Sequence, residues 1–152
     1  MRMRRVGRRL LGIRSERAAA LVEFALVVPL LMMIMCATID FGLAVYTLNN
    51  LTAAVREGGR YAATIPQPGP TTNDANVRDR VYKYIVGMNN GLTQAQVLSL
   101  ISVSTPDANG NITIQITGYP YKPVTPLSNM FGLGTISLNR RAIFRWEMAN
   151  SL

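Results

Sequence analysis

The chain of 152 residues contains no histidine and a single cysteine, Cys36. Without histidine it lacks the side chain that most often acts as a general base near neutral pH, and with one cysteine it cannot form an internal disulfide. The acids Asp74, Asp79, Asp107 and Glu147 show no paired spacing typical of a metal or hydrolase site, and no phosphate-binding glycine motif is present. The sequence therefore predicts no enzyme, no metal and no cofactor, and indicates a function in assembly or binding.

The longest apolar segment, residues 18–39, holds one charged residue, Glu23, and is otherwise interrupted only by Pro29 and Thr38. At about 1.5 Å of rise per residue, a helix of this length covers roughly 33 Å, enough to cross the apolar core of a bilayer. We interpret the segment as a transmembrane helix that has the lipid bilayer as its partner. An acid inside such a span is costly and is usually kept for a partner or a function. The alternative is that Glu23 reaches the cytoplasmic interface or is protonated.

Positive charge is concentrated before this segment. Residues 1–17 carry seven arginines against Glu16, a net charge of +6, so all other residues contribute only +2 of the total of +8. The positive-inside rule therefore predicts a basic cytoplasmic leader over residues 1–17 and export of the chain from about residue 40 onward. Nucleic-acid binding is not supported, because no aromatic or groove-reading element accompanies the arginines. A removable secretory signal is a further alternative, but the apolar segment is longer than a usual signal core.

The helix is expected to continue beyond the membrane. Residues 40–63 contain no proline, and their apolar residues recur at steps of three, four or seven, which indicates one apolar stripe on an exported extension of the same helix. Gly58 and Gly59 indicate either fraying or a close packing contact near its end. Three prolines at positions 66, 68 and 70 then predict an extended linker. The residues of the stripe are Phe41, Val45, Leu48, Leu51, Val55 and Ala62.

Residues 64–152 are predicted to form a small exported head domain. A second helix is expected over residues 73–88, capped by Asn73 or Asp74 and stopped at residues 89–91. The fold class is α+β: a long N-terminal helix, a second short helix, and a small antiparallel sheet of about three strands packed on the exported half of the long helix. Apolar residues with a period of two predict these strands at residues 101–104, 112–117 and 135–147, with a loop at 120–134 before the last one.

Several segments resemble a known family in their order along the chain. They are RAAALVEFALVVP at 17–29, IDFG at 39–42, AVREGGRYAA at 54–63 and GYPYKPVTPL at 118–127. The first three are similar to the N-terminal block of the TadE-like family of the tight-adherence (Flp, type IVc) pilus system. The fourth, followed by a strand, resembles the ending of that family.

The resemblance implies a pseudopilin or minor pilin: a single-pass protein of the bacterial inner membrane, with a cytoplasmic N-terminus and a C-terminal domain in the periplasm or in a pilus. Its partners would be a prepilin peptidase, other pilin and pseudopilin subunits that pack through the N-terminal helix, and the pilus assembly platform. By position, the peptidase would cut between Ala18 and Ala19. Glu23 would be the acid at the fifth mature position and Phe24 the aromatic residue after it. The residue before the cut is usually Gly in this family, and this chain departs from the pattern with Ala18.

A second hypothesis stays open from the residues themselves. The same span and head would suit a permanently membrane-anchored, exported binding domain without a role in polymerisation. Glu23 discriminates between the two hypotheses, because a simple anchor has no use for an acid within its span.

Overall fold

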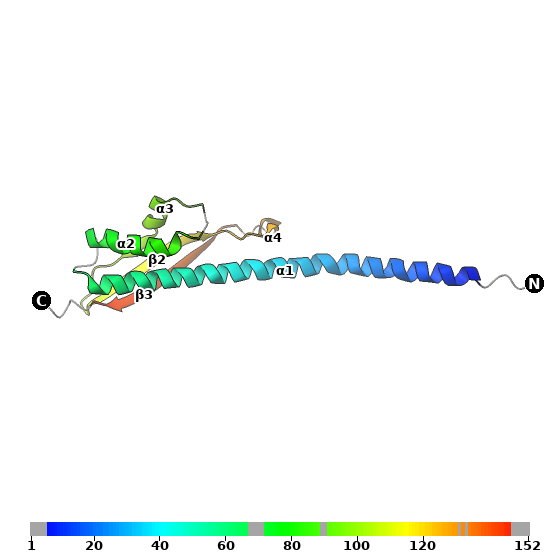
Figure 1. Ribbon diagram of the computed structural model, residues 1–152, viewed down its shortest axis with the longest axis horizontal. Coiled ribbons are helices and arrows are strands. Elements are labelled where there is room, and N and C mark those ends of the chain that lie inside the picture. Colours follow the sequence, from blue (N-terminus) through cyan, green and yellow to red (C-terminus); the bar gives the residue numbers. More distant parts are fainter. Residues whose placement is uncertain (1–5, 67–71, 89–90, 131, 133, 147–152) are drawn as a thin grey trace, which may run out of the picture. The chain divides into compact units, whose positions relative to one another are not determined.

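The computed structural model describes residues 6–66, 72–88, 91–130, 132 and 134–146. The contacts within the chain divide it into two units, Met1–Ile39 and Asp40–Leu152, and each is described by itself. Figure 1 shows the order of the helices and strands along the chain.

A single helix, α1 (Val6–Thr64), runs through the described part of the first unit and continues into the second. This confirms the predicted continuous helix, which begins earlier in the chain than the predicted transmembrane segment. Pro29 lies inside the helix without ending it. The hydroxyls of Thr38 and Thr47 donate to the backbone carbonyls four residues earlier, at 2.8 and 2.9 Å. These hydroxyls are therefore satisfied by the helix itself, as an apolar environment requires.

The second unit is an α+β domain, which confirms the predicted fold class. Its sheet has the order β1-β2-β3, and both neighbouring pairs are antiparallel. After α1, the elements are α2 (Thr72–Ile85), α3 (Gln94–Ser99), β1 (Ile101–Val103), β2 (Asn111–Tyr121), α4 (Pro126–Met130) and β3 (Ile136–Arg145).

Strand β2 contains one irregularity of register, between Ile116 and Tyr119. Gly118 has a φ of 73° there, a backbone conformation that favours glycine, and its N–H donates to Oδ1 of Asn139 at 2.7 Å. Before this bulge the even-numbered residues of β2 are buried, and after it the odd-numbered Tyr119 and Tyr121 are buried. One extra residue in a strand moves the following side chains to the opposite face. The bulge therefore places the two tyrosines on the same side as the preceding isoleucines.

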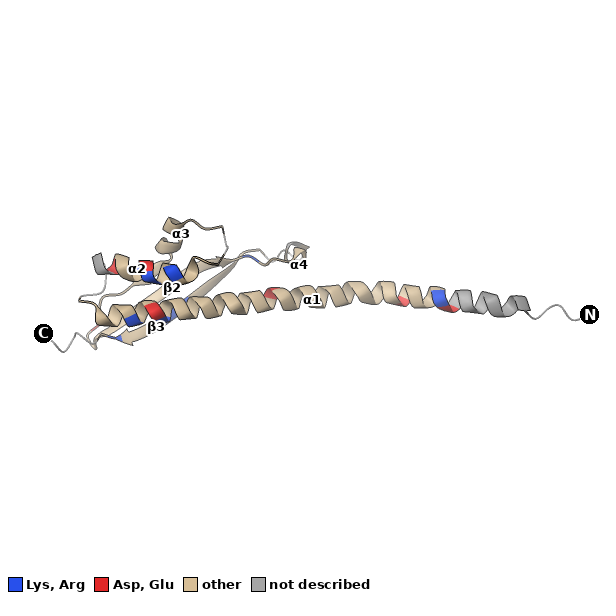
Figure 2. Ribbon diagram, in the orientation of Figure 1, with Lys and Arg blue, Asp and Glu red and all other residues tan. Residues whose placement is uncertain are grey.

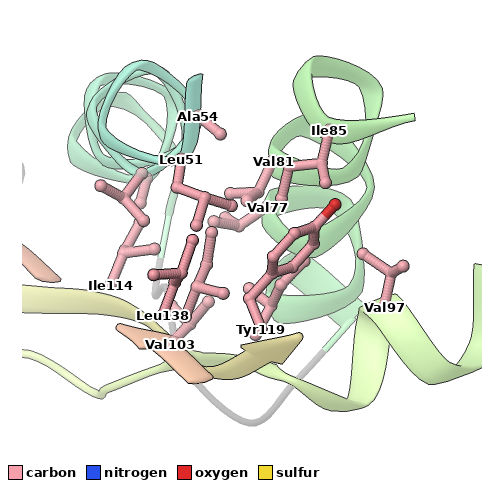
Figure 3. Close-up of a cluster of buried hydrophobic side chains, with 14 of the residues drawn as sticks. Leu51, Ala54, Val77, Val81, Ile85, Val97, Val103, Ile114, Tyr119 and Leu138 are labelled. Carbon is pink, nitrogen blue, oxygen red and sulfur yellow. The ribbon is translucent and has the colours of Figure 1, made fainter. Parts of the chain in front are cut away.

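The second half of α1 and the helix α2 cover one face of the sheet. Figure 3 shows Leu51 and Ala54 of α1 beside Val81 of α2, with Ile114 and Leu138 of the sheet facing them. These five residues are all buried. The cluster also includes Val55 and Ala62 of α1, Val77 and Ile85 of α2, Val97, Ile101, Val103, Ile112, Ile116, Tyr119 and Tyr121.

The predicted apolar stripe of α1 is confirmed from Leu48 onward and is wrong at its beginning. Leu48 is partly buried against the core, but Phe41 is 71% exposed and Val45 is 38% exposed. Phe41 and Val45 therefore lie on a side of α1 that the rest of the head leaves uncovered, while Ala44 packs against the core.

The two adjacent glycines of α1 are close-packing positions, which decides between the two alternatives drawn from the sequence. A Cβ atom added at Gly58 would lie 2.3 Å from Cγ2 of Val81, and one added at Gly59 would lie 2.0 Å from the ring of Phe144. Both distances are far below normal contact distances. The absence of a side chain at these positions lets α1 approach α2 on one side and β3 on the other.

Several predicted boundaries need correction. Helix α2 begins at Thr72, so Asn73 and Asp74 lie inside it and neither is its cap. The helix ends at Ile85, before the stop predicted at residues 89–91. Residues 89–90 lie outside the described part of the chain. Two short helices were not predicted. Helix α3 starts with a capping box, in which Thr93 and Gln96 bond to each other's backbone N–H groups. Helix α4 occupies part of the predicted loop 120–134, and β2 takes the first two residues of that loop.

Replacing Gly58 by alanine should lower the stability of the fold, because the stiff, fully buried Val81 leaves no room for the methyl group. Overpacking of this kind costs about 1–3 kcal/mol, which exceeds the roughly 1 kcal/mol that alanine gains over glycine within a helix. The measurement is denaturant unfolding of the full chain in detergent micelles. Gly42→Ala is the matched control, since nothing lies within 4 Å of its added Cβ.

Adding Val81→Ala should restore part of the stability lost in Gly58→Ala, because it removes the clashing Cγ2 atom. The coupling between the two substitutions is then read from a double-mutant cycle. Equal stability of the Gly58→Ala and Gly42→Ala variants would contradict the close-packing interpretation.

Candidate functional site

The predicted processing and assembly residues lie on the exposed surface of the first unit. Ala18, Ala19, Glu23 and Phe24 are all exposed. Because residues four apart lie one turn from each other on a helix, Ala19 and Glu23 share a face of α1. Among the residues that the structure describes, Glu23 has no ion-pair partner.

Exposed apolar side chains surround these residues. Helix α1 is long and apolar enough to cross a membrane, and none of its most apolar stretch of 18 residues is buried in the structure. A soluble monomer rarely exposes so large a continuous apolar surface, so this segment needs lipid or protein around it. The exposed large apolar residues of this unit are Leu21, Val22, Phe24, Leu26, Val27, Leu30, Leu31, Met32, Ile34, Met35 and Ile39.

The first residue of the second unit, Asp40, is the centre of a hydrogen-bond cluster. Its Oδ1 atom accepts the backbone N–H groups of Val124 at 2.8 Å and of Thr125 at 3.1 Å, and its Oδ2 atom accepts the hydroxyl of Thr125. The phenol of Tyr121 donates to the backbone carbonyl of Asp40 at 2.8 Å. Asp40 therefore fixes the segment that follows β2 to the first turn of α1 in this unit.

The protonation states at this cluster suit its hydrogen bonds. Burial raises the pKa of the Asp40 carboxyl, but the hydrogen bonds from Thr125 and Val124 outweigh burial and leave the pKa below its usual value. Burial and the nearby charge of Asp40 raise the pKa of the Tyr121 phenol. At neutral pH the carboxylate therefore carries its charge and the phenol keeps the proton that it donates.

This cluster joins two of the segments that carry the family resemblance. Asp40 belongs to the segment 39–42, while Tyr121, Val124 and Thr125 belong to the segment 118–127. Sequence reasoning missed the contact because the residues are more than 80 positions apart and neither segment has a local pattern that indicates its partner. The available signal was an isolated acid directly after an apolar run.

Two other polar contacts join α1 to α2 and to β3. Glu57 pairs with Arg80 of α2 at 3.1 Å, and Arg140 of β3 donates to the hydroxyl of Thr52 at 3.1 Å. Within the described residues, no group of three or more His, Cys, Asp or Glu side chains is placed to hold a metal ion. These polar contacts of α1 therefore support the packing of the head.

Replacing Asp40 by alanine should release the segment after β2 while leaving the core folded. Hydrogen bonds to a charged group contribute about 1.5–3 kcal/mol each, so the amides of Val124 and Thr125 should exchange with solvent at least about tenfold faster. Residue-resolved hydrogen exchange of the full chain in micelles measures this effect. Asp79→Ala, which removes an exposed pair with Lys83 on α2, is the control. Unchanged exchange at both amides would show that Asp40 does not hold this segment.

Comparison with protein-family models gives a match to the family described as TadE-like protein, over residues 18–60. Comparisons with curated proteins and with solved structures give no match. The matched segment contains the exposed apolar part of α1, Asp40 and the close-packing glycines. This family is structural and is associated with the tight-adherence pilus. Residues 18–60 are therefore similar to the TadE-like family, the family that the sequence motifs predicted.

Proposed function

We propose that the protein is a pseudopilin or minor pilin subunit of a tight-adherence (type IVc) pilus or secretion machine. The observation that carries the proposal is the coincidence of the family match with an exposed apolar helix that contains one acid, Glu23. The proposed subunit is inserted in the inner membrane by residues 18–39 and assembles through helix–helix packing. Its partners are the lipid bilayer, other pilin and pseudopilin subunits, a prepilin peptidase and the assembly platform.

The proposed orientation follows from the charges that flank the span. The seven arginines of residues 1–17 stay in the cytoplasm, and the head formed by residues 64–152, with the 40–63 part of α1, is exported. This orientation presents the junction of Ala18 and Ala19 to a peptidase on the cytoplasmic side. It also places Glu23 close to the cytoplasmic end of the span.

Cleavage between Ala18 and Ala19 would create a free amine four residues before Glu23. Pairing of this amine with a carboxylate offsets the cost of holding either charge in lipid. The two groups can meet within one helix at the i, i+4 spacing, or the amine of one subunit can reach Glu23 of the next. The second arrangement gives each incoming subunit a defined register, which is the role we assign to Glu23, with Phe24 beside it on the packing surface.

The second candidate is a permanently membrane-anchored, exported binding domain. The exposed apolar helix supports membrane insertion in both cases, so it does not separate them. The acid within the span favours the assembly subunit, because an anchor is more stable in lipid without it.

A protease added to the outside of spheroplasts should digest the head, because the arginine-rich leader directs the opposite end to the cytoplasm. Immunoblotting with an antibody against the head measures the loss, and a cytoplasmic protein that stays intact shows that the membrane is sealed. A head that survives in spheroplasts and is digested only after lysis would contradict the orientation.

Glu23→Gln should insert in the membrane at least as well as the wild type, because an acid near the centre of a span costs about 2.5–3.5 kcal/mol and less toward its edge. Its incorporation into pili should nevertheless fall, since the amine of a neighbouring subunit loses its partner. The measurement is piliation and co-purification with other pilus components at matched membrane levels of the subunit. N-terminal sequencing establishes whether the mature chain begins at Ala19.

Glu16→Gln is the matched control, because it removes an acid just before the span and outside the mature chain. Wild-type assembly by Glu23→Gln would leave the anchored binding domain as the better explanation. Loss of assembly in both variants would point to a general effect of acid removal.

A further inference from the structure

The second unit carries exposed apolar residues at the end that contains Asp40. Phe41 is 71% exposed, Tyr46 61%, Val124 72% and Met130 71%. We call these four residues the apolar collar. The head domain does not use these four side chains for its own core.

The collar lies where the chain leaves its apolar N-terminal segment. Phe41 follows Ile39 by two residues in the same helix, which corresponds to about 3 Å along its axis. The carboxylate of Asp40 holds Val124 at this turn. The buried Ser128 donates to the carbonyl of Thr125 at 2.9 Å and so ties α4, which ends at Met130, to the same place.

The sequence around the collar is almost free of charge. No charged residue lies between Asp40 and Arg56 in α1, and none lies between Lys122 and Arg140. In Figure 2 the corresponding stretch of α1 is tan, the colour of the uncharged residues. A surface of this composition is poorly suited to bulk water, and its one exposed cation, Lys122, lies two residues before Val124.

A shallow groove of about 210 Å³ adjoins the collar within the second unit. Its lining comes mainly from α1 and from the end of β2 and the residues that follow it, and it includes Tyr46, Lys122 and Val124. Tyrosine and lysine next to exposed apolar side chains are typical of residues at a membrane–water interface, where each has an apolar part and a polar end. The groove is also lined by Leu43, Thr47, Gly87, Met88, Tyr119, Pro120 and Tyr121.

The collar does not lie on one face of the helix. Residues five apart on a helix are separated by about 140° around its axis, so Phe41 and Tyr46 point to different sides. A second copy of the chain docked on one face would leave one of them in water. Lipid surrounds a helix on all uncovered sides, and this geometry therefore favours lipid as the occupant.

We infer that the apolar collar lies in the interface of the membrane, with Phe41, Tyr46, Val124 and Met130 at the boundary between headgroups and acyl chains and Lys122 directed to lipid phosphates. This inference rests on the proposed function, because insertion of residues 18–39 is what brings lipid to this end of the head. The head is then seated on the bilayer at two places, the start of α1 in this unit and α4. Asp40 is the positioning residue that holds these two places together.

The experiment uses the full chain in lipid nanodiscs and a fluorophore attached to single thiols. The native Cys36 reports on the span, and Val124→Cys in a Cys36→Ser background reports on the collar. Ser102→Cys in the same background is the control, because Ser102 is exposed on β1 and pairs with Gln115, in the part of β2 that precedes the bulge, whereas Val124 follows the other end of that strand. Nitroxides on the lipid headgroup or deep on the acyl chain act as quenchers, and circular dichroism confirms that each variant is folded.

We expect the probe at Val124→Cys to lose most of its emission with the headgroup nitroxide, the probe at Cys36 to lose it with the deep nitroxide, and the probe at Ser102→Cys to respond to neither. Quenching at Cys36 without quenching at Val124→Cys would overturn the inference and leave the proposed function intact. If the probe at Val124→Cys were unquenched by the nitroxides and also shielded from iodide in the water, a second copy of the chain would cover the collar instead of lipid. No quenching at Cys36 would overturn both the inference and the proposed membrane insertion.

Discussion

The head domain depends on one constraint: other elements must cover the apolar face of its sheet. A three-stranded sheet with one apolar face must bury that face against another element. Here the cover comes from α2 and from the part of α1 that contains Leu51 and Val55. Gly58 and Gly59 allow this part of α1 to approach both neighbours. The helix that contains the long apolar segment is therefore also part of the head's core.

The two acids in the apolar part of α1 have opposite surroundings. Asp40 receives three hydrogen bonds on its carboxylate from the segment after β2, so its charge is satisfied within the chain. Glu23 lies on an exposed surface and has no ion pair with any described residue. An acid with internal partners supports the fold, whereas an exposed acid among apolar residues is available to something outside the chain. This contrast is the physical basis for assigning assembly to Glu23 and architecture to Asp40.

Local periodicity was enough to predict most of the fold. The steps of three and four after Leu48 and the alternation of Ile112, Ile114 and Ile116 each report one buried face, and a buried face is a local property of the sequence. The Asp40 cluster depends on contacts across more than 80 residues, which no local pattern encodes. Phe41 was assigned to the stripe because periodicity identifies an apolar face of a helix but not which edge of that face is covered, and here Ala44 packs against the core while Phe41 is exposed.

The bulge in β2 changes which alternate residues of the strand face the core. Up to Ile116 the core side chains fall on even positions, and from Tyr119 they fall on odd positions. A single alternating pattern drawn through residues 111–121 would assign one half of the strand to the wrong face. Related heads are therefore best aligned in two blocks that meet at the position of Gly118, with a gap of one residue allowed there. A one-residue deletion at that point would remove the bulge and leave both tyrosines on the side of the preceding isoleucines, because residues two apart in a regular strand lie on the same face.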